Sequence, residues 1–435
     1  MEKHLDRLQE MSNVISSEPV GMVTDMSKDM LIEKPMVGGI DTNACVEAMV
    51  NGKYKVCSLG KLAKDIRDLK RKGKLIEARV YDCGTNRFEK VLEINDSATL
   101  GNTSQYVIVT SGGRYIDVSS NKYLSVCEDG VSDSLVRANR LSVGDKLVRD
   151  TGRHNRKAMS MKVKDAEYEG MSQFCGLYWV LGWFAFLGSY IGGSSATSFS
   201  RGEEGLLDKM CEILKQEGFI SDIESDTTVI DYDRGKKGKY QYLRLLASTG
   251  FSDFLREFYD GELRCDRVIP DCVFNWADSK KLSFLSGIID SRGHVEKLSG
   301  GLRLSITCLN GVLVWQVWGL LKGLGYDASV YRIWRRERNG YGYNLYVIPD
   351  KRLLQFSQKG YASLLEEYVE DTEGVTSVEE IKKLSSIAAK RMSSDTCKVT
   401  KIIGYNNHKL LVGIRTESGY LTVNGVRIRD CKYIE

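Results

Sequence analysis

The pattern of apolar and polar positions divides the chain into segments with different predicted structures. In residues 1–16, the apolar side chains Leu5, Leu8, Met11 and Ile15 recur every three or four positions, which predicts a helix. Residues 17–38 contain prolines and methionines without a regular period. We therefore expect residues 1–38 to form an N-terminal extension, which is either an exposed tail or a docking segment.

Short β-rich runs that end at turn residues characterise residues 39–150. The runs are residues 45–50, 106–110 and 123–126, and the turn pairs that follow them are Asn51-Gly52, Gly112-Gly113 and Asp129-Gly130. Asn-Gly and Gly-Gly between such runs favour β-hairpins, so this segment is predicted to be an all-β module. One helix is expected at residues 59–69, and we interpret the basic run at residues 70–74 as its solvated end.

Residues 173–371 have a mixed α/β texture that repeats once. Residues 186–193 and 285–293 end two apolar helices, and residues 213–219 and 320–326 end two later helices with similar phrases. Each copy then enters a basic hairpin. Two copies about a hundred residues apart predict a pseudo-twofold pair of αββαββα-like halves.

The remaining segments complete the domain organisation. Residues 151–172 and 372–397 are expected to be linkers, residues 398–431 return to short strands, and residues 432–435 form a tail. Strand-rich sequence at both ends of an α/β insert predicts one split β module. The fold class is therefore a multidomain α+β protein.

Composition narrows the function classes. Lys and Arg number 62 against 58 Asp and Glu, so the net charge of +4 allows local basic patches but no strongly basic whole surface. Four His argue against a His-rich metal site. Eleven scattered Cys without a CxxC pair indicate reduced thiols in a soluble intracellular protein of the cytoplasm or nucleus. The longest apolar run, at residues 178–191, is too short and too often broken by small residues to span a membrane.

Several phrases resemble a known family. Residues 284–293 look like a LAGLIDADG helix, with Arg267-Val-Ile-Pro270 upstream of it, and residues 413–431 look like the C-terminal splice block of an intein. The chain resembles a LAGLIDADG-type intein or a homing endonuclease descended from one. This resemblance implies a Hint-like β module, at residues 39–150 and 398–431, split by a LAGLIDADG homing-endonuclease-like domain at residues 173–371.

Positions that carry DNA cleavage in the family differ here. The resemblance implies one acid at the end of each LAGLIDADG helix, where the two acids bind divalent ions. Gly193 and Arg292 occupy these places, while Asp290 is expected to be structural. We therefore expect no bound metal and no cofactor. Mg²⁺ is implied only if the chain is an active endonuclease with atypical ligands.

Positions that carry splicing in the family differ as well. The residues at these positions are Gly39 at the first junction, Lys122 and Ser418 in place of two His, Arg429 and Asp430 before the second junction, and Cys431 after it. Only Cys431 retains a nucleophile. The resemblance therefore implies that splicing is lost, because acyl transfer needs both a nucleophile and a proton donor.

The expected nucleic-acid contacts are less altered. Basic residues in the two hairpins and upstream of the second motif are Arg234, Lys236, Lys237, Lys239, Arg244, Arg267, Arg332, Arg335, Arg336 and Arg338. In the second hairpin they alternate with Tyr331, Trp334, Tyr341 and Tyr343, which suits phosphate contacts and base stacking. We expect DNA as the partner, with RNA and protein partners of a larger complex as further candidates. No membrane is expected. No dimer is required either, because both motifs lie in one chain.

Three functions remain open at this point. The first is a nucleic-acid-binding pseudoenzyme that neither cuts nor splices, acting as a regulator or as a subunit of a nucleoprotein complex. The second is an active LAGLIDADG endonuclease. The third is a non-catalytic scaffold for protein docking.

Overall fold

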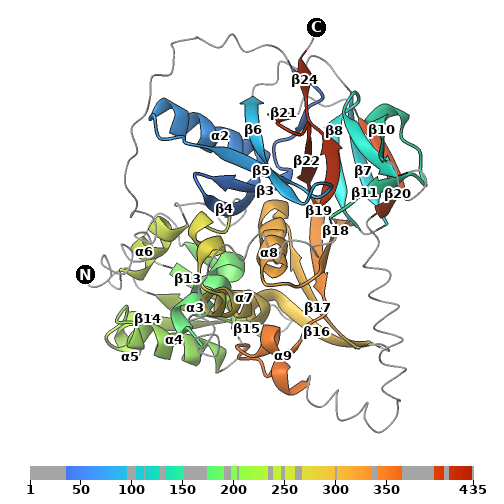
Figure 1. Cartoon of the computed structure of the whole chain (residues 1–435). Coiled ribbons are helices and arrows are strands. Elements are labelled where there is room, and N and C mark those ends of the chain that lie inside the picture. The colour runs from blue at the N-terminus through green and yellow to red at the C-terminus, as the bar shows by residue number, and fades with distance from the viewer. Residues whose placement is uncertain are drawn as a thin grey trace.

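The computed structural model describes residues 36–95, 104–111, 113–127, 133–150, 174–190, 197–202, 205–233, 239–245, 250–259, 267–298, 301–335, 340–364, 396–405 and 411–433. The predicted helix at residues 1–16 and the linker at residues 151–172 lie outside these ranges, as does most of the linker at residues 372–397. The described residues form a mixed α+β structure with large antiparallel sheets (Figure 1).

Strands from both ends of the chain build the β module. From the first part come β1 (Met36–Val37), β2 (Ile40–Asp41), β3 (Cys45–Val50), β4 (Lys53–Ser58), β5 (Ala78–Asp82), β6 (Arg87–Asn95), β7 (Gln105–Thr110), β8 (Tyr115–Ser119), β9 (Tyr123–Cys127), β10 (Asp133–Arg137) and β11 (Lys146–Val148). From the last part come β20 (Thr396–Tyr405), β21 (Leu411–Thr416), β22 (Tyr420–Val423), β23 (Val426–Arg429) and β24 (Lys432–Tyr433).

The late strands lie between early ones. The strand order of the main sheet is β22-β23-β9-β11-β20-β7-β8-β2-β21-β6-β5-β3-β4, with β10 beside β9. Strand β20 therefore pairs with β11 and β7, and β21 pairs with β2 and β6. The two ends of the described chain also meet, because β1 pairs with β24.

Local signals explain the first hairpin and its helix. Asn51 and Gly52 take positive φ values of 50° and 78° between β3 and β4, which confirms the turn predicted there. Helix α2 (Leu59–Arg71) follows, and the Ser58 side chain accepts a hydrogen bond from the backbone N–H of Lys61 at 3.3 Å as its N-cap. The helix predicted at residues 59–69 is therefore confirmed, and its apolar side packs on the core of the β module.

The middle of the chain contains the two predicted copies. The first copy is α3 (Gly176–Leu187), β12 (Gly188–Tyr190), β13 (Thr197–Gly202), α4 (Leu206–Gln216), the short α5 (Ile223–Asp226), β14 (Thr227–Asp233), β15 (Lys239–Leu245) and α6 (Phe251–Phe258). After the 3₁₀ turn η5 (Asp271–Asn275), the second copy is α7 (Asp278–Arg292), β16 (Gly293–Leu298), β17 (Gly301–Cys308), α8 (Gly311–Gly323), β18 (Ala328–Arg335), β19 (Gly340–Val347) and α9 (Lys351–Leu354).

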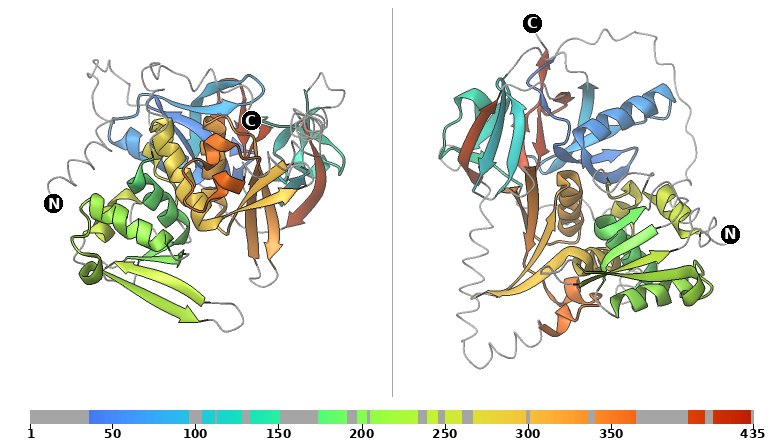
Figure 2. Two further views of the ribbon diagram at one scale, coloured as in Figure 1. Left: turned by 90° about the horizontal axis from the view of Figure 1, so that it is seen from below. Right: turned by 180° about the vertical axis from the view of Figure 1, so that it is seen from behind.

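Each copy forms a four-stranded sheet of the same topology. The strand orders are β12-β13-β15-β14 and β16-β17-β19-β18, which confirms the internal repeat. Seen from below, the β14–β15 and β18–β19 hairpins extend toward the same side of the molecule (Figure 2, left). The two sheets therefore stand side by side, with α3 and α7 packed between them.

Helices α3 and α7 cross at two glycines. A Cβ on Gly182 would lie 1.8 Å from the Phe284 carbonyl oxygen, and a Cβ on Gly287 would lie 1.9 Å from that of Trp179. Gly188, the next glycine along the chain, takes no part in this crossing, because a Cβ on it would meet the Phe184 ring of its own helix.

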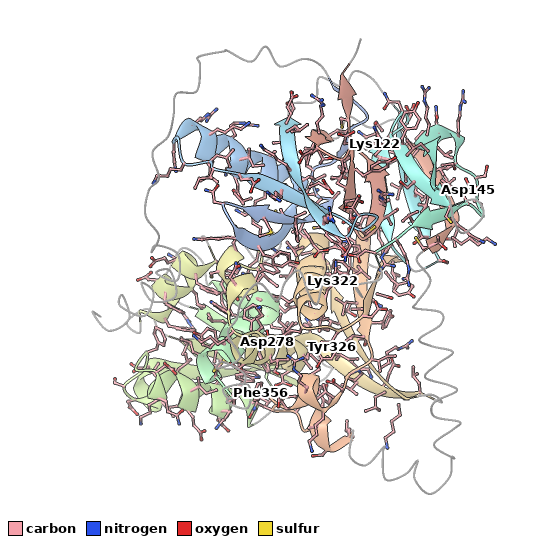
Figure 3. All side chains as sticks on the ribbon, in the orientation of Figure 1. Lys122, Asp145, Asp278, Lys322, Tyr326 and Phe356 are labelled. Atoms are coloured by element: carbon pink, nitrogen blue, oxygen red, sulfur yellow. The ribbon has the colours of Figure 1, made fainter. Side chains whose placement is uncertain are left out.

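The β module and the α/β region share a buried interface. The Gln316 side chain of α8 donates to the Val56 carbonyl of β4 at 2.9 Å. The buried Lys322 ammonium, which is labelled in Figure 3, bonds the carboxylates of Glu47 and Asp150. Within the described ranges, no helix is long and apolar enough to cross a membrane, and the ten cysteines are all free thiols.

Candidate functional site

The ends of α3 and α7 can be matched through their crossing glycines. Gly182 and Gly287 make equivalent contacts, so residues at equal distances from them are equivalent. Five positions later, both helices end, α3 at Leu187 and α7 at Arg292. Leu187 is the buried counterpart of the half-buried Arg292. Gly193 lies outside the described residues, and its expected equivalence with Arg292 is replaced by that of Leu187.

Asp290 links the two helices. Its carboxylate accepts hydrogen bonds from Trp179 Nε1 of α3 at 2.8 Å, from the backbone N–H of Gln358 at 2.7 Å, and from the Ser357 hydroxyl. Burial raises the pKa of this carboxyl, although the three donors offset part of that rise. These contacts fit the structural role expected of Asp290.

Arg267 has a different place from the one predicted. It was expected to contact DNA, but it is fully buried. Its guanidinium donates to the Phe184 carbonyl at 2.5 Å and to the Gly188 carbonyl at 3.2 Å, and it stacks 4.1 Å from the Phe184 ring centre. Arg267 therefore caps the C-terminal end of α3, where helix carbonyls need donors and where a cation suits the helix dipole.

The outer face of the second sheet is polar. Alternate residues of its strands, such as Leu304 and Leu345, are buried against the helices, so the residues between them face outward. The outward residues are His294, Glu296, Arg303, Ser305, Thr307, Ser329, Tyr331, Asn344 and Tyr346. The residues of this face are half-buried to exposed.

Contacts within this face hold the side chains in place. The Arg303 guanidinium lies 4.8 Å from the Tyr346 ring centre and 2.8 Å from the Glu296 carboxylate. Asn344 donates to the Tyr346 hydroxyl at 2.9 Å and accepts from the Thr307 hydroxyl at 3.2 Å. Of this face, Tyr331 was named from the sequence and the other residues were not, although the alternation of Leu and polar residues in β17 is typical of a strand with one outward polar face.

The described basic residues of the two hairpins have different roles. In the first sheet, Arg244 lies between the buried Leu243 and Leu245 and therefore faces outward. In the second, the Arg332 guanidinium stacks between Tyr341 at 3.6 Å and Tyr115 of the β module at 4.8 Å. Arg332 thus joins the hairpin to the β module. The backbone of Lys239 and Arg335 lies in β15 and β18. The other predicted contacts, Arg234, Lys236, Lys237, Arg336 and Arg338, lie outside the described residues.

Residues at the positions of the splice junctions meet in space. The buried Cys431 thiol donates to the Gly38 carbonyl at 2.9 Å, and the buried Lys122 Nζ lies 3.4 Å from the Cys431 sulfur (Figure 3 labels Lys122). Gly39, next along the chain, accepts a backbone bond from Ser119 at 3.0 Å. From the resemblance, Lys122 and Cys431 were both assigned to positions that act in splicing, and their side chains are in contact in the structure.

The other three residues at the positions of the splice block also have local contacts. The Asp430 carboxylate accepts from the backbone N–H of Thr416 at 3.0 Å. Arg429 stacks 4.7 Å from the Tyr420 ring centre, and the Ser418 hydroxyl accepts from the Tyr420 backbone N–H at 3.3 Å. Each of these side chains is engaged in local structure.

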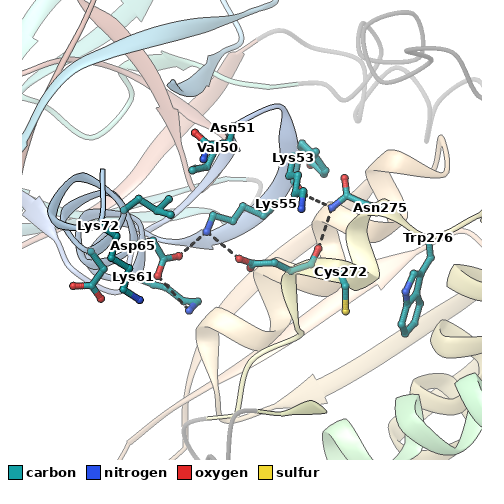
Figure 4. Close-up of a pocket in the computed structure, with 14 residues that line it drawn as sticks. Val50, Asn51, Lys53, Lys55, Lys61, Asp65, Lys72, Cys272, Asn275 and Trp276 are labelled. Atoms are coloured by element: carbon teal, nitrogen blue, oxygen red, sulfur yellow. Dashed lines mark hydrogen bonds and ion pairs between the residues drawn. The ribbon is translucent and has the colours of Figure 1, made fainter. Parts of the chain in front are cut away.

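A cavity of about 690 Å³ separates α2 from η5 (Figure 4). Its lysines are partly neutralised, because Lys55 lies 2.6 Å from Asp65 and 2.9 Å from Asp271. Across the described parts of the chain, no three His, Cys, Asp or Glu side chains are placed to hold a metal ion. The cavity is therefore lined by both acidic and basic side chains and by Trp276. Its lining includes no residue of the helix ends, of the outer face of the second sheet or of the splice positions.

With this geometry in place, the chain can be compared with known proteins. Residues 279–361, which run from α7 past α9, match the family model described as the LAGLIDADG-like domain. The second copy is therefore similar in sequence to the LAGLIDADG-like domain. No curated protein sequence matches the chain.

Solved structures resemble the chain at low identity. Full-length DUF199/WhiA from Thermatoga maritima is 16% identical at a TM-score of 0.31, over 55% of this chain and 72% of that one. I-DmoI in complex with DNA and Mn is 16% identical at a TM-score of 0.28, over 41% and 92%. The transcription factor IIB Mvu mini-intein is 19% identical at a TM-score of 0.22, over 26% and 69%.

Proposed function

We propose that this protein binds duplex DNA through the outer faces of its two four-stranded sheets and that it neither cleaves DNA nor splices. The outer face of the second sheet carries the proposal. Arg303, Asn344 and Tyr346 offer donors and acceptors that contacts within the face hold in position. Such side chains on a β-surface suit hydrogen bonds to base edges in the major groove and to phosphates.

The ends of α3 and α7 favour binding without cleavage. In the LAGLIDADG-type resemblance, metal-dependent cleavage needs a carboxylate at each helix end. Leu187 has no ligand atom, and Arg292 is a permanent cation that opposes a divalent ion. The half-buried Arg292 cation suits a DNA phosphate between the sheets.

Binding of fluorescently labelled duplex, measured by anisotropy over a range of salt concentrations, tests the proposal. We expect binding that weakens as salt rises, because phosphate contacts release counterions. Arg303→Gln should weaken it. Arg79→Gln is a matched control. Arg79 forms an ion pair with Glu77 at 2.8 Å, as Arg303 does with Glu296, and its side chain is 46% exposed, compared with 40% for Arg303. Arg79 lies in β5, away from the second sheet.

Three results would contradict the proposal. An absence of duplex binding at low salt would favour the scaffold function. Cleavage of duplex with Mg²⁺, abolished by a chelator, would favour the endonuclease function. If Arg79→Gln weakens binding as much as Arg303→Gln does, the outer face of the second sheet is not the binding surface.

A further inference from the structure

Three lysines of the β module lie on one sheet face beside the β18–β19 hairpin. Lys146 of β11 and Lys398 of β20 are register partners, and Lys401 lies further along β20. All three side chains are exposed, whereas the neighbouring Leu147, Cys397 and Val399 are buried. We call Lys146, Lys398 and Lys401 the lysine row.

The strand register places this row next to the hairpin. Lys401 is opposite Val109 of β7, and Val109 is opposite Tyr115 of β8, so the three share a face. Two strand spacings separate Lys401 from Tyr115, or about 10 Å. Tyr115 is the ring on which Arg332 stacks.

Further contacts fix the hairpin against this edge. A Cβ on Gly113, in the β7–β8 turn, would lie 2.1 Å from the Tyr331 ring. The backbone N–H of the adjacent Ser111 donates to the Lys398 carbonyl at 2.7 Å. The rings of Tyr115 and Tyr343 lie 5.7 Å apart. The β18–β19 hairpin therefore packs on the same edge of the β module that carries the lysine row.

The charges of this surface are unbalanced. Like charges directly opposite each other in a sheet are destabilising, as at Lys146 and Lys398. The Asp145 carboxylate, next to Lys146 in the chain, accepts from the Ser142 backbone N–H at 2.9 Å, and the Asp117 carboxylate of β8 accepts from the Tyr405 hydroxyl. Among the described residues, no salt bridge to a lysine of the row is found. A pair that costs stability and remains exposed is suited to binding a polyanion.

We infer that the lysine row contacts the phosphates of duplex DNA that extends past the β18–β19 hairpin. This inference rests on the proposed function and adds the β module to the binding surface. The partner is the duplex backbone rather than a base sequence, because lysine ammonium groups are point charges that contact phosphates. The β module thereby lengthens the bound segment without reading its sequence.

The test uses the full chain, duplexes of about 15 and about 40 base pairs, and a salt titration. The row variant combines Lys146→Gln, Lys398→Gln and Lys401→Gln. The control variant combines Lys64→Gln and Lys70→Gln in α2 with Lys72→Gln at its C-cap, and α2 lies across the β module from β20 (Figures 1 and 2). We expect the row variant to bind the long duplex about 10-fold or more weakly and to lower the salt slope by about 2 to 3, since each lost lysine contact removes about 0.9. The short duplex should be bound as by the unchanged protein.

The outcomes separate this inference from the proposed function. If the unchanged protein binds neither duplex, the proposed function fails and the inference fails with it. If the unchanged protein binds both but the row variant matches the control on the long duplex, the inference alone is overturned. A variant with arginine at all three row positions should retain binding, and its failure would also overturn the inference. The row variant should unfold at the same or a higher temperature, because it removes the Lys146–Lys398 repulsion.

Discussion

Gly182 and Gly287 each face the backbone of the other's helix, at virtual Cβ distances of 1.8 Å and 1.9 Å from a carbonyl oxygen. The helices run in the same direction, since the Cys175 backbone N–H donates to the Ser283 hydroxyl near their starts and Trp179 donates to Asp290 further along. Their C-terminal ends therefore lie on one side of the molecule. The contact at Gly182 and Gly287 stabilises the helix pair. It also determines that Leu187 and Arg292 occupy equivalent positions at the two helix ends.

Alanine at either crossing glycine should destabilise the protein. The added methyl group would overlap backbone atoms, which cannot move aside as a flexible side chain can. We expect Gly182→Ala and Gly287→Ala each to lower the free energy of unfolding by about 1–3 kcal/mol, despite the better helix propensity of alanine. Thermal and denaturant unfolding would measure the loss.

A neighbouring substitution provides the control for these variants. The Ser286 hydroxyl is buried and has no hydrogen-bond partner among the residues that the structure describes. Ser286→Ala should therefore leave the stability unchanged or raise it, because it removes an unsatisfied polar group. Equal destabilisation by Ser286→Ala and Gly287→Ala would mean that this segment tolerates no substitution. The loss of stability could then not be assigned to the helix crossing.

Restoring acids at the helix ends tests the equivalence of Leu187 and Arg292. Two carboxylates placed at one junction repel each other until a divalent ion neutralises them. We expect the double variant Leu187→Asp, Arg292→Asp to gain thermal stability on addition of Mg²⁺ or Mn²⁺, whereas the unchanged protein should not. A thermal-shift titration with each ion measures this effect.

The matched control uses the assignment made from sequence. The double variant Gly193→Asp, Arg292→Asp has the same charges but should gain no stability from either ion. If this variant responds to metal and the Leu187 variant does not, the equivalence drawn from the crossing glycines is wrong. Arg292→Ala alone should be insensitive to both ions.

The sequence predicted local elements better than contacts between distant residues. The Asn51-Gly52 turn and α2 follow from neighbouring residues, and the repeat follows from two similar phrases. Gly182 was missed because three small residues interrupt one apolar run, and periodicity does not tell which of them meets a partner helix. Arg267 and Lys322 look like surface cations in sequence. Only in the folded chain does Arg267 meet the α3 carbonyls and Lys322 meet Glu47 and Asp150.

Asp290 should tolerate asparagine but not alanine. Asparagine can accept from Trp179 Nε1 and the Gln358 N–H with its oxygen and donate to the Ser357 hydroxyl, so Asp290→Asn keeps every contact. Alanine leaves buried donors unpaired, and we expect Asp290→Ala to cost about 3 kcal/mol. Denaturant unfolding of both variants measures the difference.

The pH dependence of Asp290 provides an independent check. Burial raises the pKa of this carboxyl above its ordinary 3.8, so the folded protein binds the proton more tightly than the unfolded chain. Its contribution is fully present below pH 3.8 and is lost as the pH rises through the folded-state pKa. Asp290→Asn should remove this component from the stability profile. If Asp290→Asn has the same stability–pH profile as the unchanged protein, the pH dependence comes from other groups.

Lys322 should be essential to the interface because it compensates two buried carboxylates. Desolvation alone would lower the pKa of Lys322, but Glu47 and Asp150 outweigh it and raise the pKa, so the ammonium stays charged. We expect Lys322→Met to destabilise the protein by about 3–5 kcal/mol, since it leaves buried charges uncompensated. Adding Glu47→Gln and Asp150→Asn should recover part of the loss. Lys61→Met, at a half-exposed ion pair with Asp65, should change the stability by less than about 1 kcal/mol.

The purified chain should remain intact, because the residues at its junction positions are engaged as structural contacts. Gly39 supplies no nucleophile, the Cys431 thiol donates to the Gly38 carbonyl at 2.9 Å, and the Lys122 ammonium donates to the Cys431 sulfur rather than to a departing nitrogen. Acyl transfer needs an activated nucleophile and a proton donor to the leaving group. After prolonged incubation with added thiol, intact-mass measurement should therefore give one full-length species, for the protein and for Cys431→Ala alike. A break between Gly38 and Gly39 or after Asp430 that disappears in Cys431→Ala would identify Cys431 as an active nucleophile and overturn this expectation.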